Sequence, residues 1–160
     1  MVDDFRARIA AEATDPKQAV RLWFDAVFVY TSGEDELGAD MITEMTKDNN
    51  WQRAASYFVR ALDHNPHIFR SYARGSAPEN DYAMSPDDYA LTFTRTETQP
   101  YPDREEGEYV KMFVESSGAD SPRPIEVQRN SRGEYKVSNF SSICSGIRPP
   151  ATDAAARDDF

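Results

Sequence analysis

The chain has 160 residues, enough for one domain that buries roughly two-thirds of the surface its unfolded form exposes. Its formal net charge of −10 argues against partners such as nucleic acid or an anionic membrane, because phosphate groups repel so acidic a surface. An aromatic content of 12% indicates a folded core rather than a disordered chain.

Several further classes are excluded by what the chain lacks. Cys144 is the only cysteine, so neither an internal disulfide nor a cysteine-based zinc site can form. No apolar run approaches the ~18 residues of a membrane span, and Met1–Ala10 has the charges of a soluble segment rather than the apolar run of a signal peptide. Glycine-rich phosphate loops and serine-nucleophile elbows are absent. We therefore expect a cytoplasmic protein with no cofactor.

The amino-terminal half predicts helices. Residues 1–14 read as a short helical lead-in. Asp15-Pro16 is a strong helix start, because Asp15 can accept from the free amide groups of the first turn and proline suits the first helical position. The helix then runs to Gly33, and its apolar stripe predicts that Trp23 is buried.

Two further helices are predicted after the first long one. Glu34–Thr46 and Trp51–Leu62 each place apolar residues on one face. Pro66 ends the second of these, since the residue before a proline avoids the helical region. His67–Arg74 is compatible with either a helical turn or a short strand.

The carboxyl-terminal half predicts an antiparallel sheet. Apolar and polar residues alternate in four segments, and the turn-forming gap Asn130–Gly133 has the length of a hairpin loop. The four segments are Tyr89–Thr98, Tyr109–Ser116, Pro124–Arg129 and Glu134–Phe140. Helices followed by hairpin-linked strands predict a single α+β domain over residues 15–150, with helices packed on a curved sheet of about four strands. Residues 151–160 are expected to be a flexible tail.

One local pattern is similar to a known fold class. The string Gly133-Glu134-Tyr135-Lys136-Val137 resembles a glycine-x-aromatic-x-valine pattern in the last strand of cone-shaped domains, the nuclear transport factor 2-like and cystatin-like folds. The order of helices before strands is the same in those folds. The resemblance implies a curved sheet wrapped around the first long helix.

A second resemblance covers roughly residues 50–150. Its strings are Asn80–Met84, Tyr89–Leu91, Gly107–Val114, Ser116–Ile125, Gly133–Val137, Ser141-Ser142 and Gly146–Pro150. Together they resemble an uncharacterised bacterial family known only as a domain of unknown function. The resemblance implies a bacterial protein and carries no activity with it.

The segment Ser116–Pro124 is the first candidate site. Gly118 allows a positive φ, Asp120 can bond to the backbone that follows it, and two prolines stiffen the exit. A recognition role would use Ser117, Asp120 and Arg123 to contact a ligand. A structural role would instead have Asp120 cap the turn and pair with Arg123.

Asp25 is the second candidate, because it is the carboxylate within the apolar run of the long helix. In a cone-shaped fold it would enter the pocket between helix and sheet, accompanied by Tyr30 and Tyr109, and act as a base. The alternative places Asp25 on the solvent edge of the helix, in an i,i+4 ion pair with Arg21.

Two weaker candidates complete the survey. His64 and His67 could share a metal only if helical, but Pro66 separates them and a third ligand is missing, so no metal site is predicted. Cys144 has no nearby base or orienting group and is expected to be a small buried side chain.

The sequence therefore predicts a binding or protein-interaction module without catalytic activity. Its partner would be a protein or a small molecule, and the pattern does not set the oligomeric state. The alternative is a small-molecule enzyme of isomerase or hydratase type that uses Asp25 as its base.

Overall fold

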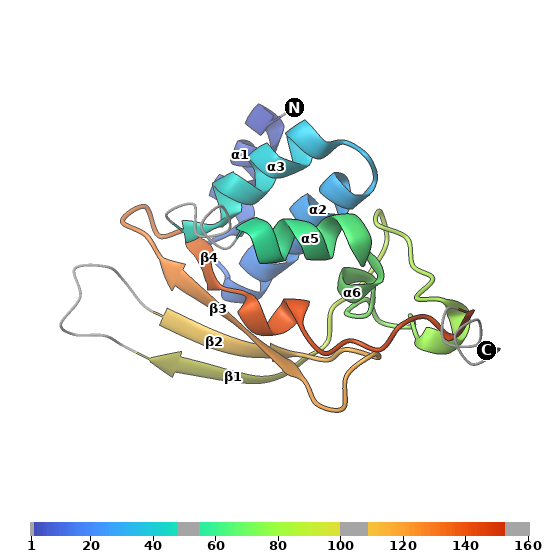
Figure 1. Ribbon diagram of the computed structural model, residues 1–160. Coiled ribbons are helices and arrows are strands. Elements are labelled where there is room, and N and C mark those ends of the chain that lie inside the picture. The colour runs from blue at the N-terminus through green and yellow to red at the C-terminus, as the bar shows by residue number, and fades with distance from the viewer. Residues whose placement is uncertain (1, 48–54, 100–108, 153–160) are drawn as a thin grey trace.

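The computed structural model describes residues 2–47, 55–99 and 109–152, and it has the predicted α+β architecture (Figure 1). The helices are α1 (Val2–Glu12), α2 (Pro16–Thr31), α3 (Asp35–Met45), α5 (Ala55–His64) and the short α6 (His67–Arg70). The strands are β1 (Phe93–Gln99), β2 (Tyr109–Val114), β3 (Arg123–Arg129) and β4 (Tyr135–Asn139). Two short 3-10 helices, η2 (Pro78–Asn80) and η3 (Ser141–Cys144), lie before the first strand and after the last.

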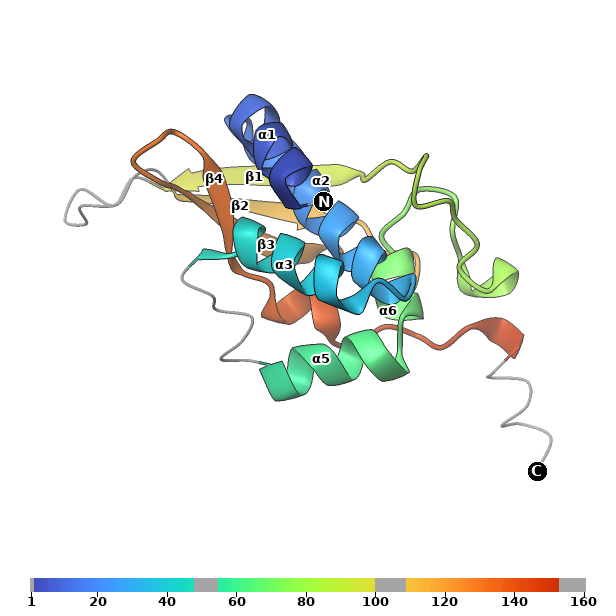
Figure 2. The same ribbon diagram turned by 90° about the horizontal axis from the view of Figure 1, so that it is seen from above.

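The four strands form one antiparallel sheet in the order β1-β2-β3-β4. The predicted hairpin between β3 and β4 is confirmed, because Gly133 has φ +82° and the Asn130 side chain closes the turn. Its Oδ1 accepts hydrogen bonds of 3.0 Å from the backbone N–H groups of both Arg132 and Glu134. The sheet curls without closing, and all the long helices lie over the same face (Figures 1 and 2).

Helix α2 begins and ends where its local signals predict. The Asp15 carboxylate accepts a 3.3 Å hydrogen bond from the backbone N–H of Gln18, and Pro16 is the first helical residue. Gly33, with φ +108°, follows the last turn.

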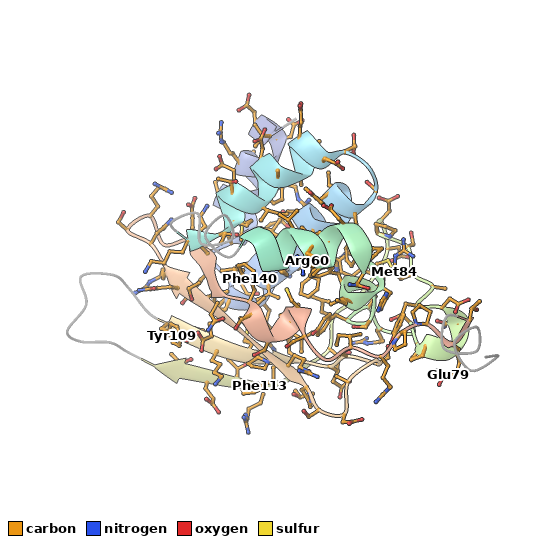
Figure 3. The ribbon with its side chains drawn as sticks, viewed as in Figure 1. Arg60, Glu79, Met84, Tyr109, Phe113 and Phe140 are labelled. Atoms are coloured by element: carbon orange, nitrogen blue, oxygen red, sulfur yellow. The ribbon has the colours of Figure 1, made fainter. Side chains whose placement is uncertain are left out.

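Aromatic rings pack around Trp23 of α2, from α2 itself, from α5 and from the segment after β4. Trp23 is fully buried, as predicted, with its ring centroid 5.8 Å from that of Phe58 and 5.4 Å from that of Phe140. Phe24 contacts Trp23 edge to face at 5.2 Å. Figure 3 shows Phe140 on the side of the sheet that faces α5.

Helices α1 and α3 pack against each other and against α2. Helix α1 buries Phe5 and Ile9, which lie four residues apart on one face, and the carbonyl oxygen of Ala13 accepts a 2.8 Å bond from the backbone N–H of Tyr135. Helix α3 crosses α2 at Gly38, where a Cβ atom would lie 2.5 Å from the backbone nitrogen of Tyr30.

One predicted strand begins later in the structure, and one ambiguous segment takes one of its two predicted forms. The strand expected from Tyr89 begins at Phe93, because the Tyr89 ring turns toward α2 instead of joining the sheet. The ambiguous segment from His67 is the helical turn α6. The start of the helix expected at Trp51 and the tail residues 153–160 lie outside the described residues, so the mobility of the tail stays a prediction.

Candidate functional site

The loop of residues 116–122, called here the 116–122 loop, is fastened to the end of α6. Ser116 is buried, and its Oγ lies 2.7 Å from the Oγ of Ser71. The backbone N–H of Ser117 donates to the carbonyl oxygen of Ser71 at 2.9 Å, and the N–H of Gly118 donates to Ser116 Oγ at 3.3 Å. The first half of the loop therefore has a fixed backbone.

The other side of the loop is held by residues 145–152, called here the C-terminal strap. Arg148 donates from its backbone N–H to the carbonyl oxygen of Gly118 at 2.9 Å and from Nη1 to the Asp120 carboxylate at 2.7 Å. Its Nη2 reaches the carbonyl oxygen of Ser117 at 3.3 Å. The Tyr82 hydroxyl donates to the Arg148 carbonyl oxygen at 2.6 Å.

The strap is also bound by a turn with unusual backbone geometry. Asp81 and Tyr82 both have positive φ, 56° and 57°, a conformation that non-glycine residues seldom adopt. The Asp81 carboxylate accepts a hydrogen bond from the hydroxyl of Thr152 at 2.8 Å. Burial raises the pKa of the Tyr82 phenol. These contacts hold a conformation that would be disfavoured in isolation. The strings Asn80–Met84, Ser116–Ile125 and Gly146–Pro150, far apart in sequence, thus meet in one place.

Gly118 is needed for a different reason from the one predicted. Its φ is not among the positive values, so left-handed backbone does not explain the residue. Instead, a Cβ atom at this position would overlap the Tyr82 hydroxyl and lie 2.7 Å from Cγ2 of Ile147. Only glycine lets the strap and the Tyr82 turn approach the loop this closely.

A cavity of about 310 Å³ opens beside the loop and is called here the loop pocket. Residues 71–76 form one wall, and Thr92 and residues 115–122 other than Gly118 form the other. Arg74 lines the first wall, where its Nε donates to Thr92 Oγ1 at 3.0 Å. Glu115 and Asp120 are acidic residues of the other wall, so residues of both charge signs line the pocket, and the Asp120 carboxylate is paired with Arg148.

The structure brings together two of the three residues predicted for this site. Ser117 and Asp120 line the loop pocket, whereas Arg123 lies outside its lining and donates from Nη2 to the carbonyl oxygen of Gly146 at 3.2 Å. The expected Asp120–Arg123 pair is wrong, because the partner of Asp120 is Arg148. The expected turn cap is also replaced, since the Asp120 side chain is 96% exposed and points to that partner.

The sequence does not predict that residues 71–76 line a pocket. Arg74 ends the segment His67–Arg74, for which the sequence allows a helical turn or a short strand, and Ser76 follows it without a functional prediction. Their proximity to Glu115 depends on a contact between segments about forty residues apart, as in the Ser71–Ser116 bond. Local sequence patterns carry no signal for such a pairing.

Asp25 lies in a second depression, of about 520 Å³, at the solvent edge of α2. Its Oδ1 accepts from Arg21 Nε at 3.4 Å and from the Tyr89 hydroxyl at 2.7 Å, and its Oδ2 accepts from Arg8 at 2.9 Å. The i,i+4 pair with Arg21, the predicted alternative for this residue, is present. Burial and the neighbouring Asp25 carboxylate raise the pKa of the Tyr89 phenol, so Tyr89 keeps its proton and donates.

The two tyrosines expected beside Asp25 lie elsewhere. The Tyr30 hydroxyl bonds to Asp63 at 3.3 Å, and burial together with that carboxylate raises the pKa of its phenol. Tyr109 belongs to β2, where Val110, Met112 and Val114 point into the core and Tyr109 therefore points to the outer face. The structure does not bring these three side chains together.

The remaining candidates show packing contacts. Cys144 is buried, as predicted, and burial raises the pKa of its thiol to about 12. The His67 ring stacks on Tyr82 with centroids 5.7 Å apart, and the side chain of His64 lies outside those described. Over the described part of the chain, no three His, Cys, Asp or Glu side chains cluster closely enough to hold a metal ion.

A family model described as Domain of unknown function (DUF6935) matches residues 1–151, and the chain belongs to this family. The match extends over more of the chain than the resemblance to residues 50–150 indicated, and it agrees with an uncharacterised family. Searches of curated proteins and of solved structures found no match. In a scan of the helices in the described residues, none had the length and apolarity needed to cross a membrane.

Proposed function

We propose that the protein is a binding module and that the loop pocket is its recognition site. The observation that carries the proposal is a preformed pocket whose 116–122 loop has a fixed backbone and exposed side chains. Ser116 and Gly118 are buried and bonded, while Asp120 and Ser121 are exposed at the rim. Such preorganisation lowers the entropy cost of binding, because the loop does not have to be ordered by its ligand.

The ligand class follows from the size and charges of the pocket. A volume of about 310 Å³ is at the lower end for small-molecule sites. Arg74 on one wall and Glu115 on the other complement a ligand that carries both a carboxylate and an amine. We therefore infer a small zwitterionic ligand, such as an amino acid or a dipeptide. A protein partner is the alternative that the test below would detect.

The proposal includes two further assignments. Helix α2 packs against β3 and β4 of a curled antiparallel sheet, which supports a cone-like fold of the nuclear transport factor 2-like or cystatin-like kind. We also propose a cytoplasmic protein, and the acidic composition supports one that binds neither nucleic acid nor anionic membranes.

An enzyme that uses Asp25 as its base is the second candidate, favoured by the depression around that carboxylate. A general base must offer a lone pair to the proton that it abstracts. Both oxygens of Asp25 already accept hydrogen bonds, from Arg8, Arg21 and Tyr89. The same contacts are those of a structural ion-pair cluster, so the binding module is the better supported function.

The test is amide chemical-shift mapping with a panel of free amino acids and dipeptides as probes. We expect at least one probe to shift the signals of residues 71–76 and 115–122. Arg74→Ala should weaken that binding about tenfold, the effect of losing one charge-assisted hydrogen bond. Arg70→Ala is the matched control, because Arg70 is exposed on α6 and does not line the pocket.

Two outcomes would overturn the proposal. Shifts confined to the residues around Asp25 would move the site to the second depression and favour the enzyme. A panel that shifts none of the loop-pocket signals at millimolar concentration would reject a zwitterionic ligand. If a co-purified protein shifted them instead, the site would stand with a protein partner in place of the small molecule.

A further inference from the structure

Strand β1 forms one edge of the sheet, and among the described strands it pairs only with β2. Figure 1 shows it as the outermost strand, with no other helix or strand of the described residues beyond it. Thr94, Arg95, Thr96 and Thr98 are exposed. An edge of this kind presents unpaired backbone N–H and C=O groups, which can accept another strand.

The sequence of this edge is complementary to itself. Thr94-Arg95-Thr96-Glu97-Thr98 has threonine at alternate positions and one charge of each sign on either side of Thr96. In an antiparallel pair with a two-fold axis at Thr96, that residue would face its own copy. Arg95 would then face Glu97 of the second copy, and the same pair would occur twice.

The charges already present in the sheet favour the same partner. Glu97 lies opposite Lys111 of β2, and Lys111 lies opposite Glu126 of β3, so the row alternates in sign and ends at the edge with a negative group. A strand added beyond β1 extends this row best with a positive side chain opposite Glu97. Arg95 of a second copy supplies that charge.

Phe113, which lies opposite Arg95 on β2, positions the Arg95 side chain. The guanidinium carbon of Arg95 lies 4.1 Å from the centroid of the Phe113 ring, which stacks beneath it. Figure 3 shows Phe113 on the face of the sheet away from the helices. Within one chain Arg95 Nε also contacts Glu97 at 3.2 Å, with side chains 63% and 40% exposed, so both groups remain accessible.

We propose that two copies of the chain associate through antiparallel pairing of β1, with Thr96 on the two-fold axis. The two four-stranded sheets then become one continuous sheet. The register irregularity between Phe93 and Arg95 limits the paired ladder to a few residues at that end. A contact this small gives weak association, about micromolar in dissociation constant.

The experiment is sedimentation equilibrium of the full chain at about 0.15 M salt, where charges more than ~8 Å apart are largely screened. Arg95→Glu and Glu97→Arg each place two pairs of like charges across the axis, and each variant should be monomeric. An equimolar mixture of the two should dimerise, because every facing pair is again of opposite sign. The double variant R95E/E97R should dimerise for the same reason.

Arg129→Glu is the matched control. It changes the net charge as Arg95→Glu does, but from an exposed position on β3. It should dimerise like the wild type, and far-ultraviolet circular dichroism should show that every variant is folded.

A wild-type chain that remains monomeric at millimolar concentration would overturn the proposal. It would equally fail if either single variant dimerised like the wild type, or if the mixture stayed monomeric. The loop-pocket test measures chemical shifts on addition of a probe, whereas this test measures the mass of the chain, so the two proposals fail separately.

Discussion

Replacing Gly118 by alanine tests whether the 116–122 loop is fixed by close packing. The added Cβ would overlap the Tyr82 hydroxyl and lie 2.7 Å from Ile147 Cγ2, so one of these groups must move. Tyr82 is fully buried and its hydroxyl donates to the Arg148 carbonyl oxygen, which leaves it little room. The substitution should therefore disturb the loop, the turn and the strap together.

The expected loss is about 1–3 kcal/mol of the free energy of unfolding, the usual effect of inserting a methyl group into a packed region. In a chain of this length the melting temperature should fall by about 2–4 °C for each kcal/mol. Asp120→Ala, two residues later, is the matched control. That side chain is 96% exposed, so the change should stay within about 0.5 kcal/mol.

A double-mutant cycle with Tyr82→Phe identifies the group that the methyl meets. Phenylalanine lacks the hydroxyl, so Gly118→Ala should cost about 1 kcal/mol less in that background than in the wild type. Urea unfolding with linear extrapolation supplies the four free energies. Additive effects of the two substitutions, or a Gly118→Ala variant as stable as the wild type, would refute the packing argument.

Three further substitutions and one alkylation measurement test the core and the charged cluster. Trp23→Ala should lower the free energy of unfolding by about 3–5 kcal/mol, and a near wild-type melt would show that α2 packs differently. Gly38→Ala should cost about 1–3 kcal/mol, because the Cβ meets the backbone of Tyr30, and a neutral effect would contradict the close crossing of α2 and α3. Burial raises the pKa of Cys144 to about 12, so iodoacetamide should alkylate this thiol far more slowly in the folded protein at pH 8 than in urea. In the folded protein the alkylation rate should rise only as the pH approaches that pKa. Equal rates in the folded protein and in urea would contradict the burial of Cys144. Asp25→Asn should cost about 1–3 kcal/mol, whereas a more stable variant would favour a functional carboxylate.

Local chemistry made the helices and strands predictable. Asp15, Pro16 and Gly33 act within one turn of the helix ends that they define, so the sequence alone locates α2. Asn130 and Gly133 likewise determine the turn between β3 and β4 through bonds within five residues. The burial of Trp23 follows from helical periodicity, which depends only on neighbours in sequence.

The errors occur where a distant contact decides the outcome. Tyr89 alternates correctly for a strand, but its hydroxyl bonds to Asp25, sixty-four residues away, and the strand starts later. Asp120 was expected to pair within its own turn, yet Arg148 reaches it across twenty-eight residues. Gly118 was assigned a backbone role, but the side chain of Tyr82 is what excludes a larger residue. No local rule contains these partners.

The 116–122 loop resolves an alternative that the sequence posed as exclusive. A structural turn needs buried and bonded residues, whereas a recognition element needs exposed side chains. In the structure, buried and bonded residues and exposed residues occur in the same loop, so its geometry is compatible with both roles. Ser116 and Gly118 are buried and bonded to α6 and to the strap, whereas Asp120 and Ser121 are exposed. A fixed backbone that presents exposed side chains needs little ordering on binding, so the strap contacts that stabilise the fold would also preorganise the pocket.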